Sequence, residues 1–125
     1  MKKLLVASLL LVGLALPAIA APLNFKVVPK WSKAAKGDES IGNQHGDVAV
    51  ASNGEVYVSV TGGPKAGVQV FGDDGAYLRN VPGAPNDFHG FVIHKNKEGE
   101  FIYGSRVGGQ TILKMTLDGK VVMTI

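Results

Sequence analysis

The 125-residue chain contains no cysteine, which excludes disulfide bridges, thiolate nucleophiles and cysteine-rich zinc sites. Histidine and carboxylate side chains remain as the available metal ligands. Aromatic residues make up only 7% of the chain, whereas glycine occurs 17 times and proline 6 times. Such a turn-rich composition indicates many short strands and argues against a helical bundle.

The chain also lacks the excess of one charge that marks nucleic-acid-binding proteins. Its formal net charge is +3, but without the first 20 residues eleven basic residues face ten acidic ones. From Gly37 onward seven basic residues oppose ten acidic ones, which leaves −3, because four lysines precede that point: Lys26, Lys30, Lys33 and Lys36. We therefore expect no nucleic-acid partner.

The first 20 residues have the three parts of a secretory signal peptide. Lys2 and Lys3 supply a positive start, an apolar run of 13 residues follows from Leu4 to Leu16, and Ala18 and Ala20 provide small residues before the cleavage point. The apolar run is shorter than the roughly 20 residues of a membrane-spanning helix. We expect export to the periplasm or the exterior of a bacterium, with no membrane span after cleavage; an uncleaved anchor is the alternative.

An internal repeat of 44 residues organises the rest of the chain. His45-Gly46 recurs as His89-Gly90, and three further matches share that offset: Val68 with Ile112, Asp74-Gly75 with Asp118-Gly119, and Leu78 with Val122. The repeat predicts four parts: signal peptide 1–20, an N-terminal strand or flap with a polar loop at 21–44, a first unit at 45–88, and a second, truncated unit at 89–125.

Each repeat unit predicts four short antiparallel strands. The Asn53-Gly54 pair between alternating apolar runs is a strong hairpin signal. The expected strands are 47–51, 55–60, 68–71 and 76–78 in the first unit, and 91–93, 101–103, 111–115 and 120–123 in the second. Four strands in each 40 to 50 residues are typical of a β-propeller blade. The predicted fold is all-β, with two blades of an incomplete propeller; a single sandwich of eight strands is the alternative.

Two blades do not close a propeller, which has about four to eight. The outer faces of the two blades would then stay exposed, although in a complete ring each packs against a further blade. We expect the chain to be an N-terminal fragment of a longer protein whose further blades are missing. An assembly in which several copies close one ring is the rival interpretation.

Several segments resemble the opening of six-bladed NHL-repeat propellers related to peptidyl-hydroxyglycine amidating lyase. They are Phe25–Trp31, Gly46–Val50, Gly54–Val58, Phe88–Phe91 and Gln110–Met115. The resemblance covers nearly all of the chain after the leader and implies a six-bladed ring. It also implies that His89, and His45 one blade earlier, point into a central channel, where such histidines hold a catalytic zinc.

Two departures from the family pattern weigh against lyase chemistry. Ser59–Gly62 stands where the family has an arginine after the second strand of the first blade, and Tyr103–Arg106 replaces a strand that usually ends in Thr-Asp. Threonine cannot replace an arginine that orients a substrate, because it lacks the planar, charged guanidinium group. Arg106 is therefore a candidate channel or ligand-binding residue from the next blade, with a rim ion pair as the alternative.

The candidate metal ligands are His89 and His45, and the alternative for each is a hydrogen bond to neighbouring backbone. A catalytic zinc needs three protein ligands and a water, so two histidines are too few. His94 lies on the opposite side of a period-two strand from His89, and we expect it to be solvated. Asp73-Asp74-Gly75 and Asn86-Asp87 offer oxygen ligands for calcium, although Asx-Gly turns form for backbone reasons alone.

The sequence favours an exported propeller that binds a small molecule, peptide or protein through its central channel. The alternative is a metal-dependent lyase or hydrolase of the amidating-lyase-like family with a histidine-bound ion. Zinc or calcium would be the cofactor, and whether the protein is an enzyme stays open. No catalytic residue is assigned.

Overall fold

The computed structural model describes residues 23–125 and has an all-β fold, which confirms the predicted class. Its eight strands are β1 (Asn43–Val50), β2 (Val56–Gly62), β3 (Gly67–Phe71), β4 (Tyr77–Asn80), β5 (Phe88–Asn96), β6 (Gly99–Arg106), β7 (Thr111–Thr116) and β8 (Val121–Thr124). The predicted signal peptide lies outside the described residues. In the described part of the chain, no helix has the length and apolar character needed to cross a bilayer.

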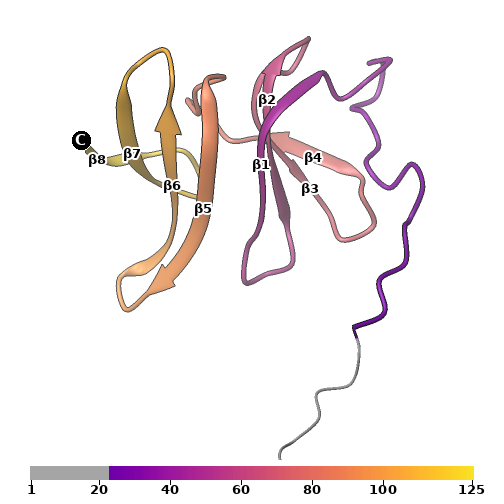
Figure 1. Ribbon diagram of the computed structural model, residues 1–125, viewed down its shortest axis with the longest axis horizontal. Coiled ribbons are helices and arrows are strands. Elements are labelled where there is room, and N and C mark those ends of the chain that lie inside the picture. The colour runs from indigo at the N-terminus through magenta and orange to yellow at the C-terminus, as the bar shows by residue number, and fades with distance from the viewer. Residues whose placement is uncertain (1–22) are drawn as a thin grey trace, which may run out of the picture.

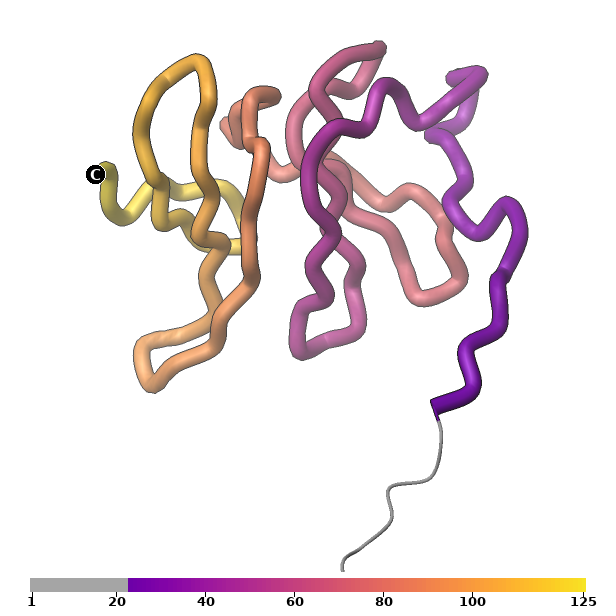
Figure 2. Tube along the Cα trace, viewed as in Figure 1, coloured from indigo at the N-terminus to yellow at the C-terminus, as the bar shows by residue number. Residues whose placement is uncertain are grey.

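The strands form two separate four-stranded antiparallel sheets, each in chain order. Sheet 1 contains β1 to β4, and sheet 2 contains β5 to β8. The two sheets stand side by side, with β1 next to β5, and both sheets fan outward from this pair (Figure 1, Figure 2). The first strands of the two sheets are therefore the elements that bring the two repeat units together.

The hairpin between β1 and β2 forms where the Asn-Gly pair predicts it. Ala51 N donates to Glu55 O at 2.9 Å, and Gly54 N donates to Ala51 O at 2.9 Å. Gly54 has a φ of 88°, a left-handed conformation that glycine adopts without steric cost. The local sequence is thus sufficient to place this turn.

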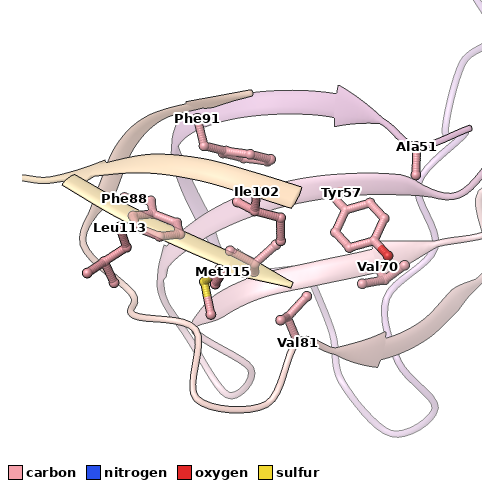
Figure 3. Packing of buried hydrophobic residues seen from close by; sticks show 10 residues of the cluster. Ala51, Tyr57, Val70, Val81, Phe88, Phe91, Ile102, Leu113 and Met115 are labelled. Carbon is pink, nitrogen blue, oxygen red and sulfur yellow. The ribbon is translucent and has the colours of Figure 1, made fainter. Parts of the chain in front are cut away.

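The main hydrophobic core lies between the two sheets (Figure 3). Tyr57, Val68 and Val70 of sheet 1 pack in one cluster with Ile102 and Met115 of sheet 2, and all five are fully buried. Burying side chains of this size contributes about 1.5–3 kcal/mol each to folding. A hydrogen-bonded contact adds to the packing at the rim, where Ser52 N and Ser52 Oγ donate to the Glu100 carboxylate at 2.8 and 2.7 Å.

The N-terminal segment covers part of the opposite side of sheet 1. Trp31 packs against a second cluster formed by Val58, Val60 and Phe71, and its indole N–H donates to the Asp73 carbonyl at 3.1 Å. Lys33 also joins the turn before β4, where its N–H donates to Gly75 O at 2.9 Å and its ammonium lies 3.6 Å from Asp74 Oδ2. An isolated bridge pairs Lys33 with Ala76. The segment therefore lies on the sheet as a flap held by the packing of Trp31 and by the contacts of Lys33.

Val68 and Ile112 hold the same position in the third strand of their sheets. Val81 N donates to Val68 O at 2.8 Å, and Ile112 and Ile125 exchange two hydrogen bonds of 2.7 and 2.9 Å. The backbone N–H and C=O groups of both residues therefore point toward the fourth strand of their sheet. Because side chains alternate between the two faces of a strand, Val68 and Ile112 then lie on the same face when the two sheets are superimposed strand by strand. On their other side, Ser59 pairs with Val68 and Ser105 pairs with Ile112.

These equivalences define a front and a back face for each sheet. The front face of sheet 1 contains Ala49, Tyr57, Ser59, Val68 and Val70, and the front face of sheet 2 contains Val92, Tyr103, Ser105, Ile112 and Lys114. The back face of sheet 2, formed by Phe91, Ile93, Ile102, Leu113 and Met115, covers the front face of sheet 1. The front of one unit therefore meets the back of the next, and the front face of sheet 2 is left uncovered by the described residues.

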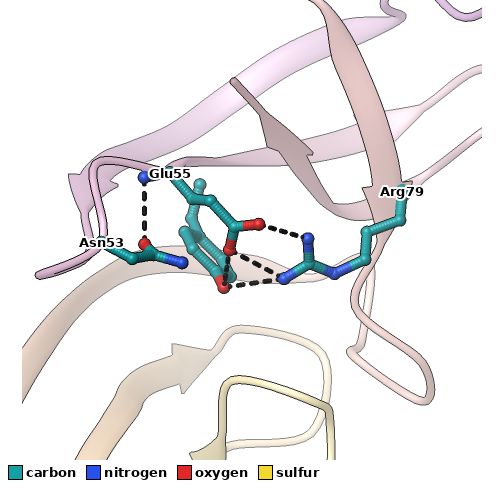
Figure 4. Close-up of polar contacts among 4 residues, drawn as sticks. Asn53, Glu55 and Arg79 are labelled. Atoms are coloured by element: carbon teal, nitrogen blue, oxygen red, sulfur yellow. Dashed lines mark hydrogen bonds and ion pairs between the residues drawn. The ribbon is translucent and has the colours of Figure 1, made fainter. Parts of the chain in front are cut away.

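A charged network braces the front face of sheet 1 beside the core (Figure 4). Arg79 forms two hydrogen bonds with the Glu55 carboxylate, at 2.6 and 2.9 Å, and Tyr57 OH donates to Glu55 at 3.0 Å. The hydrogen bonds from the Arg79 guanidinium lower the pKa of Glu55 from 4.5 to about 2. Burial, together with the adjacent Glu55 carboxylate, raises the pKa of Tyr57 to about 12.

Truncation of Ile102 tests the core between the sheets. We expect Ile102→Ala to lower the free energy of unfolding by about 2–5 kcal/mol, because the removed groups leave a cavity between two packed sheets. The matched control is Ile112→Ala on the exposed front face of sheet 2, where a loss below about 1 kcal/mol is expected. Urea denaturation at low protein concentration measures both; equal losses would contradict this assignment of the faces.

Acid titration tests the Glu55 network. The pKa of Glu55 is lower in the folded protein than in the unfolded chain, so its stabilisation is present above pH 4.5 and is lost as the pH falls toward 2. Because Arg79 is partly exposed, we expect this loss to be about 1–2 kcal/mol. Glu55→Gln should flatten the fall in unfolding free energy between pH 4.5 and 2, and Glu98→Gln, at an exposed carboxylate, should leave it unchanged. An unchanged acid profile in Glu55→Gln would refute the role of the network.

Candidate functional site

The two repeat histidines meet where the sheets meet. His45 Nδ1 and His89 Nε2 are 2.9 Å apart, within hydrogen-bond distance, and the two rings lie edge to face with centroids 4.8 Å apart. His45 lies near the beginning of β1 and His89 near the beginning of β5, and both side chains are exposed. The imidazole pair therefore links the first strands of both sheets at the surface.

The glycine after His45 permits the close approach that brings the rings together. A Cβ atom at Gly46 would lie 2.5 Å from Ser59 Cβ and 2.8 Å from the Phe88 carbonyl oxygen. Ser59 Oγ donates to that same carbonyl at 2.7 Å, in a buried hydrogen bond. Because Phe88 immediately precedes His89, this contact sets the position of the second imidazole.

Asp47 adds a second polar contact between β1 and β5. Its Oδ2 accepts a hydrogen bond from Phe91 N at 3.3 Å. Phe91 follows the second His-Gly pair as Asp47 follows the first. The imidazole pair is thus flanked by polar contacts on both sides, Ser59 with Phe88 and Asp47 with Phe91.

The imidazole pair can present one donor and one acceptor to a ligand. In a hydrogen-bonded pair of neutral imidazoles, one ring donates through its shared nitrogen and the other accepts. The outer nitrogens, His45 Nε2 and His89 Nδ1, then offer one acceptor and one N–H. Residues 23–125 form no enclosed pocket, so a ligand would reach the pair from the open surface.

The same pair supplies two nitrogen ligands for a metal ion, but not a complete catalytic site. With Zn–N distances of about 2.0–2.1 Å, two imidazoles on one zinc have their nitrogens roughly 3 Å apart, close to the separation of His45 and His89. In the described part of the chain, no three histidine or acidic side chains form a cluster that could hold an ion. These residues alone therefore do not fit the three-ligand catalytic zinc implied by the family resemblance.

Arg106 lies in an ion pair. Its Nε donates to Asp87 Oδ1 at 2.8 Å, and the other carboxylate oxygen accepts from Gly109 N at 3.1 Å. The hydrogen bond from Arg106 lowers the pKa of Asp87, and the carboxylate raises that of the guanidinium. The structure therefore has the ion pair that the sequence left as the alternative for Arg106, and a ligand would have to compete with Asp87.

The remaining candidates lie apart from the imidazole pair. His94 is exposed, as expected, and its ring lies 6.4 Å from that of Tyr103 on the front face of sheet 2. Asp74 accepts a hydrogen bond from Ala76 N at 2.9 Å and pairs with Lys33, so its carboxylate serves the turn before β4.

Sequence reasoning missed the residues that hold the histidines in place. In the sequence, Ser59 stands out only because the family pattern has an arginine nearby, and Asp47 is only part of a predicted strand. Gly46 and Ser59 of the first unit recur as Gly90 and Ser105 in the second. This repetition is a sequence signal that could have indicated the contact between Gly46 and Ser59. The pairing of Glu55 with Arg79 has no such signal, since 24 residues separate them.

Comparison with known proteins gives no relative. No family model, no curated protein and no solved structure matches the chain. The functional argument therefore rests on the residues and their geometry.

The two repeat glycines give a matched test of the close approach. Gly46→Ala should lower the free energy of unfolding by about 1–3 kcal/mol, because its Cβ would overlap Ser59 and the Phe88 carbonyl. At Gly90 the nearest atoms to an added Cβ are 3.4 and 3.6 Å away, so Gly90→Ala should change stability by less than about 1 kcal/mol. Thermal unfolding measures the loss of stability in both variants. Equal losses in Gly46→Ala and Gly90→Ala would refute the close contact at Gly46.

Proposed function

We propose that the protein is an exported NHL-type β-propeller module that binds a ligand at its hub, where His45 and His89 meet. The two sheets would be neighbouring blades of a ring, and the first strands β1 and β5 would line its channel. The family resemblance of the sequence and the geometry of the two sheets both favour this interpretation. Additional sheets are needed to complete such a ring, because closed propellers contain about four to eight.

The repeated orientation of the sheets supports the blade relationship. The front face of sheet 1 packs against the back face of sheet 2. A single rotation would therefore place sheet 1 on sheet 2 with front on front and back on back. A sandwich built on a twofold axis would instead bring two equivalent faces together. Repetition of one step in the same sense is how radial arrays grow.

The single observation that carries the binding proposal is the hydrogen-bonded imidazole pair, exposed between the first strands of the two sheets. Its outer nitrogens offer one donor and one acceptor. One residue of an extended peptide turns its own N–H and C=O to the same side, as in an antiparallel strand pair, and so carries the complementary donor and acceptor. We therefore take a peptide or amide-containing small molecule as the ligand class that this site suits best.

Imidazole NMR with a blocked peptide tests this function. Addition of N-acetylglycine methylamide to the chain should shift the ¹⁵N resonances of His45 and His89 in a saturable manner, because both outer nitrogens would change hydrogen-bond partners. His94→Ala is the control, since His94 is exposed on β5 but outside the pair, and it should bind equally well. His89→Ala should abolish the saturable shift of His45. If millimolar peptide leaves both rings unaffected, amide binding at the pair is wrong.

A metal-dependent lyase or hydrolase is the second candidate, favoured by the 2.9 Å separation of the two ring nitrogens. His45 and His89 would be two of the ligands, and a bound zinc would supply Lewis-acid chemistry. The third ligand would have to come from outside the described residues. In the same NMR experiment, saturable zinc binding that His89→Ala abolishes, without any response to peptide, would favour this candidate over the first.

A further inference from the structure

The front face of sheet 2 is an apolar surface that no part of the described chain covers. Val92 is 59% exposed, Ile112 47%, Met123 42% and Ile125 70%. Lys114 lies among them without presenting a free charge, because its ammonium lies 4.1 Å from the Phe101 ring centre and 3.4 Å from a Glu98 oxygen. This is the surface that corresponds to the front face of sheet 1, which sheet 2 buries.

A complementary surface remains on the back of sheet 1. Val48 and Val50 of β1 are 61% and 62% exposed. By strand register they correspond to Phe91 and Ile93, the β5 residues that pack toward the core on the back face of sheet 2. On the rest of this face Val58, Val60 and Phe71 are buried beneath the N-terminal segment, so only the β1 edge is open.

We propose that copies of this chain associate head to tail, with the front face of sheet 2 of one copy covering the exposed β1 edge on the back face of sheet 1 of the next. The proposal builds on the blade relationship proposed above. Both halves of the interface lie on one chain: the front face of sheet 2, and the β1 edge of sheet 1 that the N-terminal segment leaves exposed. A head-to-tail contact of this kind produces a closed ring when its rotation closes. With about four to eight sheets in a ring, two to four copies would complete it.

The polar residues of the existing interface recur at the proposed one. Ser59 of sheet 1 donates to the carbonyl of Phe88, the residue before His89. Ser105 holds the equivalent position in sheet 2 and is exposed. Its hydroxyl donates to Gly90 O at 3.2 Å within the chain, and it would exchange this partner on association. Gln44, the residue before His45, would bring its carbonyl to Ser105 of the neighbouring copy. The interface therefore offers a polar contact as well as apolar area, which argues for a second copy rather than an unrelated protein.

Light scattering on the chain from residue 21 to 125 tests the association. We expect the molar mass to reach a fixed multiple of the monomer mass, between two and four, as the protein concentration rises. Ile112→Asp should return the mass to that of a monomer while the circular dichroism spectrum is retained, because Ile112 is exposed within each copy. The control is Val107→Asp, which adds the same charge at a residue 61% exposed in the turn between β6 and β7. It should associate as the unmodified chain does.

Cysteine pairing tests the direction of the contact, because the chain has no cysteine of its own. A mixture of Gln44→Cys chains with Ser105→Cys chains should form a mixed disulfide under mild oxidation, and neither variant alone should link efficiently. Efficient self-linking of Ser105→Cys would indicate a symmetric pair of front faces and overturn the head-to-tail arrangement. A folded monomer at all concentrations would overturn self-association and leave the face to another partner.

The two experiments separate this proposal from the proposed function. Association is measured as mass, whereas hub binding is measured as resonance shifts of His45 and His89. A monomer whose imidazole pair binds the peptide refutes only the assembly. An assembly whose imidazole pair binds nothing refutes only the ligand.

Discussion

The packing of sheet 2 on the front face of sheet 1 is the interaction on which the rest of the structure depends. A single four-stranded sheet has two faces and no interior, so neither repeat unit can bury its apolar residues alone. Tyr57 and Val70 become fully buried only because Ile102 and Met115 lie against them. The same contact brings β1 to β5, and through them the two imidazoles to hydrogen-bond distance.

The candidate site is therefore a product of the interface between the sheets. The close approach at Gly46 leaves the Phe88 carbonyl within reach of Ser59, which satisfies a buried polar group that would otherwise be costly. At the rim of the interface, Ser52 of the first unit donates to the Glu100 carboxylate of sheet 2 through both its N–H and its hydroxyl. Polar pairs at several points of one apolar contact restrict how the sheets can dock, because a shift would leave each of them unpaired.

Because the front face of sheet 1 packs on the back face of sheet 2, two surfaces stay exposed in the described chain: the front face of sheet 2 and the β1 edge on the back of sheet 1. The front of sheet 2 has the same position in its unit as the face that is already buried in sheet 1, and it is exposed. The flap that carries Trp31 covers only part of the opposite surface. The proposed ligand binding at the imidazole pair and the proposed head-to-tail association both rest on this repetition: the first uses the side chains at the start of each unit, and the second uses the surfaces that remain exposed.

Periodicity and turn chemistry were enough to determine the all-β class and the order of the eight strands, because alternation and Asn-Gly turns act between residues near in sequence. They were not enough to set the strand limits, since β1, β5 and β6 extend several residues beyond the predicted ranges. The 44-residue repeat also singled out His45 and His89 as a pair. Only the tertiary structure decided that their rings touch, that Arg106 is held by Asp87, and that Ser59 supports the second histidine. These contacts depend on how one sheet docks on another, and that is decided by packing and burial summed over both faces, which no local pattern contains.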